Sequence, residues 1–153
     1  MSIVRVYADT SVFGGPFDEE FQTVSRTFFD QVRSGRFKLV TSALVQEEIE
    51  PAPTQVRALF DELLDIVDVV DVSEGALNLR EAYLERGIVS PQWADDALHV
   101  AVATVAGCSL IVSWNFKHIV HFEKVPVYNE INKLKGYESI GIFSPLEVIQ
   151  YES

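Results

Sequence analysis

The run Ile3-Val4-Arg5-Val6-Tyr7-Ala8-Asp9 is apolar and rich in β-branched residues until it ends in an acid. Such a run predicts a strand that is buried on most of both faces, as is typical of a parallel sheet. The first strand of such a sheet is usually central, and ligands bind beyond the carboxyl ends of the strands. Asp9 is therefore the first candidate for a functional side chain.

Beyond this run, the chain alternates between short apolar stretches and amphipathic patterns. Further strands are expected at residues 37–41, 67–72, 110–113 and 139–143. Helices are expected at residues 17–33, 43–50, 54–67, 74–86, 91–106 and 129–135. This order predicts an α/β domain with a mostly parallel sheet. Because no repeat or linker divides the chain, we expect a single domain over residues 1–153.

Length and composition exclude several classes of protein. The chain has 153 residues, and 48% of them are hydrophobic, which argues against disorder. No window of about 18 apolar residues predicts a membrane span. The only cysteine, Cys108, lies in an apolar run and is expected in the core, so no internal disulfide can form. A reducing cytoplasm is the expected compartment.

The formal net charge of −11 is unusual for a protein that binds nucleic acid, since phosphate contacts rest on Lys and Arg. The charge is unevenly distributed, however. Residues 43–75 contain many acids and a single base, Arg57. Residues 115–135 contain four lysines and two histidines against two acids. We expect the first stretch to repel nucleic acid and the second to tolerate it.

Three acids lie at the ends of expected elements and are candidates for one site. Asp9 follows the first strand, Glu48 lies in the helix after the second strand, and Asp96 lies near the start of an apolar helix. Carboxylates that meet at one sheet edge repel one another, and a divalent cation such as Mg²⁺ or Mn²⁺ relieves that repulsion. The topology favours their convergence, and the group would then form a metal centre.

On spacing alone, ordinary structural roles explain the same acids better than a shared site does. Asp9 can be a helix cap or turn residue, and Glu48 can be a solvated helix acid. Asp95 and Asp96 can complement the helix dipole. Only one of these two adjacent acids can face a common site, because neighbouring helical residues point about 100° apart.

Four motifs in order resemble the PIN-domain nucleases, and the nearest group is the toxin component of VapBC-type toxin–antitoxin pairs. They are Val6-Tyr7-Ala8-Asp9-Thr10-Ser11-Val12-Phe13, Ser42-Ala43-Leu44-Val45-Gln46-Glu47-Glu48-Ile49, Asp96-Ala97-Leu98-His99-Val100-Ala101-Val102-Ala103, and Leu110-Ile111-Val112-Ser113-Trp114-Asn115-Phe116-Lys117-His118-Ile119. The resemblance implies a three-layer α/β/α sandwich, Mg²⁺ or Mn²⁺, and hydrolysis of RNA. It also implies an antitoxin partner, and homodimers are common in the family.

Carried over by position, the resemblance makes Asp9, Glu48 and Asp96 the metal-binding acids and favours Glu48 over Glu47. Asn115 takes the fourth site, where many members have Asp. Its carbonyl can hold a metal-bound water, but the missing charge should weaken metal affinity.

Several other residues are candidates for contact with RNA. Thr10 and Ser11 can hydrogen-bond a carboxylate or a phosphate, although an ordinary turn role explains them as well. Trp93, Trp114 and Tyr7 can stack on bases, with core packing as the alternative, which is favoured for Tyr7 because it lies inside a strand. Lys117 and Lys124 are the best candidates for phosphate contacts.

Two other classes of enzyme do not fit, and one rival remains. A haloacid-dehalogenase-type phosphatase needs an acid two residues after Asp9, where this chain has Ser11. Gly14-Gly15 forms neither a Walker loop nor a dinucleotide-binding motif. The rival is a catalytically weak or inactive PIN-like interaction module, which Asn115 and the net charge of −11 favour.

Overall fold

The computed structural model describes residues 3–150. It shows a five-stranded sheet with the order β3-β2-β1-β4-β5, in which every neighbouring pair is parallel. The strands are β1 (Val4–Ala8), β2 (Phe37–Ser42), β3 (Asp68–Val70), β4 (Leu110–Val112) and β5 (Gly141–Phe143). The central position of β1 and the parallel sheet confirm the prediction from the sequence.

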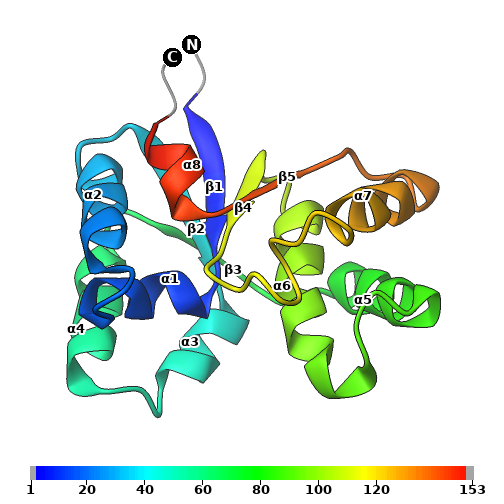
Figure 1. Cartoon of the computed structure of the whole chain (residues 1–153), viewed down its shortest axis with the longest axis horizontal. Helices are drawn as coiled ribbons and strands as arrows, with labels where there is room; N and C mark the ends of the chain where they lie inside the picture. The colour runs from blue at the N-terminus through cyan, green and yellow to red at the C-terminus, as the bar shows by residue number, and fades with distance from the viewer. Residues whose placement is uncertain (1–2, 151–153) are drawn as a thin grey trace.

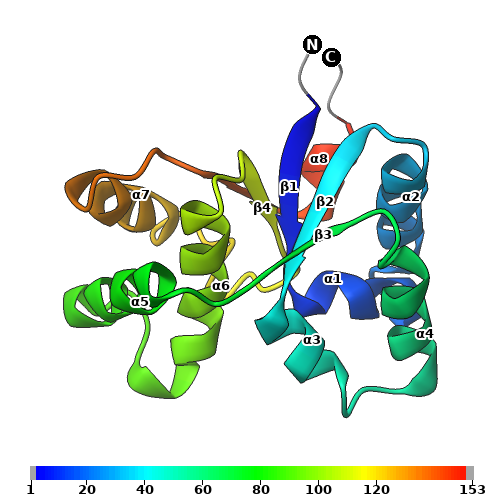
Figure 2. The ribbon, with the colours of Figure 1, turned by 180° about the vertical axis from the view of Figure 1, so that it is seen from behind.

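Helices cover both faces of the sheet and complete three layers (Figure 1). On one face lie α1 (Thr10–Gly14), the 3-10 turn η1 (Gly15–Phe17), α2 (Gln22–Arg33), α4 (Thr54–Leu63) and α8 (Pro145–Ile149). On the other face lie α5 (Glu74–Arg86), the 3-10 turn η2 (Pro91–Trp93), α6 (Ala94–Val105) and α7 (Val125–Leu134). Figure 2 shows the same layers from behind, with β3 at the near edge of the sheet. The α/β/α fold is confirmed.

One short helix, α3 (Ala43–Ile49), lies beyond the carboxyl ends of the strands rather than on a face (Figure 1). Ser42 ends β2 and caps α3, because its side chain accepts a hydrogen bond from the Val45 amide. The chain therefore turns directly from the second strand into a helix that crosses the carboxyl edge. This arrangement brings residues of α3 towards the end of β1.

The prediction of one helix over residues 17–33 is wrong for the first part of that range. The chain instead forms α1 and η1 directly after β1, and α2 begins only at Gln22. Asp18 accepts a hydrogen bond from the Glu20 amide in a local turn, which keeps this segment out of the helix. Gly15 permits the tight approach of η1 to α2, since a Cβ atom there would collide with Ser25 and with the Trp114 indole.

Other boundaries also differ from the prediction. The helix expected at 129–135 begins earlier, at Val125, with Pro126 in its first turn. The helix expected at 54–67 ends at Leu63, before the chain enters β3. The helix α8 was not predicted; it begins with a capping box between Ser144 and Glu147. Within residues 3–150, no helix is long and apolar enough to cross a bilayer.

Candidate active site

Asp9 lies at the carboxyl end of the central strand and is almost completely buried. Its backbone amide continues the β1–β4 pairing by donating to the Val112 carbonyl at 3.3 Å. Its side chain accepts hydrogen bonds from the Ser11 hydroxyl at 2.6 Å and the Ser113 hydroxyl at 2.7 Å, one on each carboxylate oxygen. Asp9 occupies the position before α1, but its side chain makes no capping hydrogen bond. A simple helix-cap role therefore does not explain this acid.

The environment of Asp9 is costly for a charged group. Burial raises the pKa of the Asp9 carboxyl above its ordinary value of 3.8, against the lowering effects of His99 and the two serine hydroxyls. The negative charge of Glu48 raises this pKa further. An anion held here without a counter-ion costs stability, and such costs concentrate at functional sites.

Glu48, in the last turn of α3, is the second acid of the site. Its Oε1 accepts hydrogen bonds from the Thr10 hydroxyl at 2.6 Å and from Nε2 of His99 at 2.6 Å. Burial alone would raise the pKa of the Glu48 carboxyl, but these two donors and the His99 charge outweigh it and leave the pKa lowered. Glu48 is therefore ionised and fixed at the site rather than freely solvated.

His99, on α6, connects the acids and was not identified from the sequence. The imidazole is 2% exposed, and its Nδ1 lies 2.8 Å from the Tyr7 hydroxyl. Burial lowers its pKa, but the hydrogen bond to Glu48 and the charges of Asp9, Glu48 and Asp96 prevail and leave the pKa raised. All three predicted acids thus act on one imidazole. The available signal was the three-residue spacing from Asp96, which places both residues on one helix face.

Asp96 lies one turn before His99 in the first turn of α6 and is half-buried. Among residues 3–150 its carboxylate makes no hydrogen bond or ion pair with another side chain. The structure therefore leaves Asp96 available for a ligand, whereas Asp9 and Glu48 are partly engaged. Its neighbour Asp95 is exposed and, unlike Asp96, lines a cavity that Glu48 also lines.

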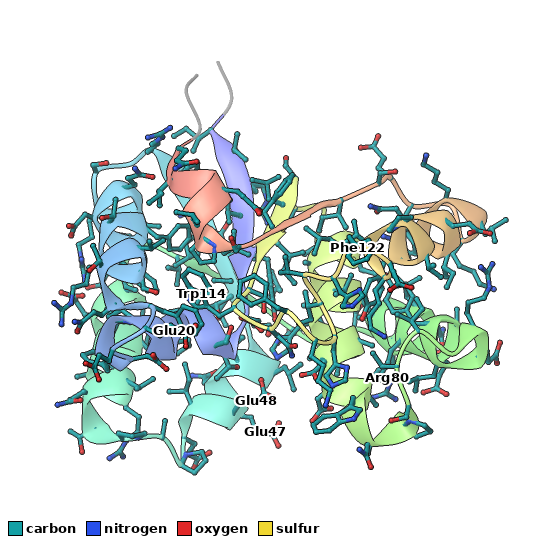
Figure 3. The ribbon with its side chains drawn as sticks, in the orientation of Figure 1. Glu20, Glu47, Glu48, Arg80, Trp114 and Phe122 are labelled. Atoms are coloured by element: carbon teal, nitrogen blue, oxygen red, sulfur yellow. The ribbon has the colours of Figure 1, made fainter. Side chains whose placement is uncertain are left out.

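A cavity of about 760 Å³ adjoins Glu48 on the β3 side of the sheet. Its walls carry four carboxylates together with small and apolar side chains; the lining residues are Ala43, Leu44, Glu47, Glu48, Asp71, Val72, Asp95 and Leu98. Figure 3 shows Glu47 and Glu48 extending from α3 into the space between α3 and α6. Glu48 is the only one of these acids that also contacts Thr10 and His99.

Asn115 lies in the loop after β4, near the serine that holds Asp9. The amide oxygen of Asn115 accepts hydrogen bonds from the backbone amides of Lys117 at 3.2 Å and His118 at 2.9 Å. The Asn115 backbone amide donates to the Ser113 hydroxyl at 2.9 Å. Both lone pairs of the side-chain oxygen therefore accept hydrogen bonds that hold the loop in its conformation. A role for this carbonyl in holding a metal-bound water remains a prediction.

The predicted RNA contacts divide into packed and accessible residues. Trp114 stacks on Phe21 with ring centroids 4.2 Å apart, and its indole N–H donates to Ser25 at 2.9 Å. Figure 3 shows Trp114 on the side of β4 towards α2, so packing accounts for this ring. Thr10 and Ser11 already donate to Glu48 and Asp9.

The accessible candidates are Trp93, in η2, and Lys117, in the loop after β4. Trp93 is 39% exposed, stacks on His118 and lies under the ammonium of Lys117, 5.6 Å from the ring centre. Burial lowers the pKa of His118. Lys124 donates to the Ile88 carbonyl at 2.6 Å, which leaves Lys117 as the better candidate for a phosphate contact.

The donor chemistry of the site fits a hard divalent cation. Asp9, Glu48 and Asp96 offer oxygen ligands, and Glu48 has one oxygen without a hydrogen bond among the described residues. Across residues 3–150, however, no three His, Cys, Asp or Glu side chains are close enough together to hold an ion. Mg²⁺ suits such an open set because it keeps several waters and binds through one or two carboxylates.

Fold and site define a PIN-like α/β/α architecture with acids at the carboxyl edge. A chain in the DNA-bound VapBC crystal structure from Salmonella typhimurium matches 94% of this chain and 99% of its own length, with TM-score 0.59 and 16% identity. FitAcB from Neisseria gonorrhoeae matches 92% and 98%, with TM-score 0.58 and 12% identity. VapC20 of Mycobacterium tuberculosis, described as a sarcin-ricin loop cleaving toxin, matches 88% and 98%, with TM-score 0.52 and 14% identity.

These matches confirm, at the level of fold, the resemblance inferred from the four sequence motifs. Neither the family models nor the curated proteins contain a match to this chain.

Proposed function

We propose that this chain is a divalent-metal-dependent endoribonuclease that hydrolyses RNA phosphodiester bonds, and that it is the toxin of a toxin–antitoxin pair or a relative of such toxins. The observation that carries the proposal is that Asp9 and Glu48 lie at the same carboxyl edge of the sheet, where the charge of Glu48 raises the pKa of Asp9. The two acids come from different elements, and each is held by hydroxyl donors that keep it in place.

Under this proposal, the cation binds directly to one or two of the carboxylates of Asp9, Glu48 and Asp96, and water completes its coordination. When bound, a divalent cation stabilises negative charge on phosphodiester oxygens and lowers the pKa of water. Ser11 and Ser113 hold the buried Asp9 carboxylate in place and, through the Trp114 and Asn115 amides, join it to the loop after β4. Lys117 offers a positive charge on that loop for a phosphate, and Trp93 offers a surface for a base.

The test compares two adjacent acids. Purified protein is incubated with total cellular RNA and single-stranded oligoribonucleotides, with Mg²⁺, Mn²⁺ or a chelator. We expect cleavage that the chelator abolishes and that Asp96→Asn reduces at least about 100-fold. Asp95→Asn is the matched control and should retain cleavage. Cleavage that persists unchanged in Asp96→Asn would contradict the proposal.

The rival function is an interaction module with weak or no activity. The commitment of the Asn115 carbonyl to its own loop and the absence of a three-acid group in residues 3–150 favour it. Under this alternative, the wild-type protein cleaves no RNA in any metal but still binds its partner. The RNA assay above therefore separates the two functions.

A cognate antitoxin is the proposed partner, and the names of the VapBC and FitAcB structures support it. The acidic cavity suits basic side chains of such a partner. We place the protein in the cytoplasm, where its RNA substrate would be, and a homodimer remains a prediction. Co-expression with the adjacent reading frame, followed by co-purification, checks the partner; growth arrest without that frame would support a toxin.

A further inference from the structure

A continuous chain of hydrogen bonds crosses the core and ends on Glu48. It begins at the Ser42 hydroxyl, which lies 2.8 Å from the Tyr7 hydroxyl. Tyr7 lies 2.8 Å from Nδ1 of His99, and Nε2 of His99 lies 2.6 Å from Oε1 of Glu48. These hydrogen bonds join two neighbouring strands, β2 and β1, to the helices α6 and α3 at the carboxyl edge of the sheet.

The direction of the last bond is fixed by the acceptor. An ionised carboxylate can only accept, so Nε2 of His99 must carry a proton and donate to Glu48. The Tyr7 hydroxyl can either donate to Nδ1 or accept from it, because a phenol does both. The bond from His99 to Glu48 therefore persists whether the imidazole is neutral or charged. Tyr7 and Ser42 hold the ring in place in both cases.

These hydrogen bonds determine which oxygen of Glu48 is available to a ligand. Oε1 receives both the Thr10 hydroxyl and the His99 N–H, whereas Oε2 has no hydrogen bond among residues 3–150. One oxygen is thus turned into the protein, and the other is left for a ligand. Second donors of this kind orient metal-binding carboxylates and typically change metal affinity by about 10- to 100-fold when they are removed.

Packing alone does not account for these residues. Tyr7 and Ser42 are completely buried, and His99 is nearly so. An imidazole and a phenol placed in an apolar core cost free energy unless they are hydrogen-bonded, and apolar residues of similar size stabilise a core at least as well. This series of hydrogen bonds therefore does more than fill space, because it ends on Glu48, one of the site acids.

We propose that His99 is a positioning residue for Glu48, held in turn by Tyr7, and that it keeps the second oxygen of Glu48 free for the divalent cation. This inference rests on the proposed function, because it assigns Glu48 to a cation. It gives a role to His99, which had none in the sequence analysis, and a different role to Tyr7.

The first test measures Mn²⁺ affinity by calorimetry on the apo protein, without RNA. His99→Leu removes the donor and should weaken Mn²⁺ binding by about 10-fold or more. His99→Gln supplies an amide N–H at a similar reach and should restore affinity to within about threefold. Tyr7→Phe should give an intermediate loss. Wild-type affinity in His99→Leu would overturn the proposal.

A matched control separates positioning from general loss of structure. Thr104, also on α6 and buried, donates to the Val100 carbonyl away from the acids. Thr104→Val therefore removes a buried hydroxyl from the same helix and should leave Mn²⁺ affinity unchanged. Melting curves of every variant without metal confirm that each one is folded.

A second readout does not depend on metal. Crystal structures of apo wild type and apo His99→Leu should show the Glu48 carboxylate displaced from Thr10 in the variant only. If Glu48 keeps its place, the positioning claim is wrong whatever the metal data show. If the wild type binds no Mn²⁺ and cleaves no RNA, the proposed function fails instead, and the displacement still decides the role of His99.

Discussion

The two ends of the sheet differ sharply in chemistry. Where the strands begin, a cavity of about 410 Å³ is lined mainly by apolar side chains, among them Phe37, Leu110 and Val148. Where the strands end, the space of about 760 Å³ carries four carboxylates, and Asp9 is buried at the same end of the sheet. One end therefore gathers apolar side chains, while the other gathers carboxylates, including the buried Asp9, whose charge is costly there. That contrast indicates where function resides, and the predictions below test it.

The largest effect is expected at the acidic end, in Asp9→Asn. Loss of this carboxylate should reduce RNA cleavage at least about 1,000-fold, which corresponds to about 4 kcal/mol in the barrier. The melting temperature of the apo protein should stay the same or rise, because burial already disfavours the Asp9 charge. Cleavage assays and thermal melting check both parts. An unfolded variant would indicate a structural role for Asp9.

At the apolar end, Phe37→Ala should show the opposite pattern. Phe37 is 4% exposed, so its truncation should lower the free energy of unfolding by about 3 kcal/mol. The rate of cleavage per folded molecule should not change, since the site lies at the other end of β2. Urea denaturation and active-site-normalised kinetics make the comparison. A selective loss of cleavage in this variant would erase the distinction between the two ends.

A smaller effect concerns the pH dependence of stability. The pKa of His99 is raised above 6.5, so its contribution is fully present below pH 6.5 and is lost as pH rises through the raised value. The pKa of Glu48 is lowered below 4.5, so its contribution is present above pH 4.5 and is lost as pH falls through the lowered value. The His99–Glu48 pair should therefore contribute most to stability between these limits.

Urea denaturation of wild type and His99→Leu from pH 4 to pH 9 measures this dependence. The free-energy difference between them should be largest between pH 4.5 and 6.5 and should shrink by about 1 kcal/mol towards pH 9. A difference that does not vary with pH would mean that the His99–Glu48 pair does not contribute as an ion pair.

The smallest effect is expected in Asn115→Asp. A carboxylate oxygen can accept the same two backbone hydrogen bonds as the amide oxygen does. The loop should therefore keep its shape while the site gains one negative charge. Mn²⁺ affinity should rise by a few-fold, measured by calorimetry. Unchanged or weaker binding would show that Asn115 lies outside the influence of the ion.

Much of the fold could be predicted from local patterns. The run before Asp9 is apolar enough to identify a central strand, and Ser42 marks the start of α3 correctly. The short helix α1 could not be found because five residues ending in glycine carry too little periodicity. Asp18, whose turn interrupts the region before α2, also gives no strong local signal.

The candidate site was only partly visible in the sequence. Asp9, Glu48 and Asp96 stand out because they are acids at the ends of elements. His99 does not, because a single histidine on an apolar helix face is indistinguishable from a core residue until α3 is placed opposite it. Trp114 shows a related limit, since its stacking partner Phe21 is far away in the sequence and this packing cannot be predicted locally.

The most direct test is to locate the ion itself. Crystals of the wild-type protein are soaked in Mn²⁺, and diffraction data are collected at the manganese absorption edge. We expect an anomalous peak within coordination distance of Asp9, the free oxygen of Glu48, or Asp96, and loss of that peak in Glu48→Gln but not in Glu47→Gln. A peak confined to other carboxylates, or no peak at saturating Mn²⁺, would contradict this expectation.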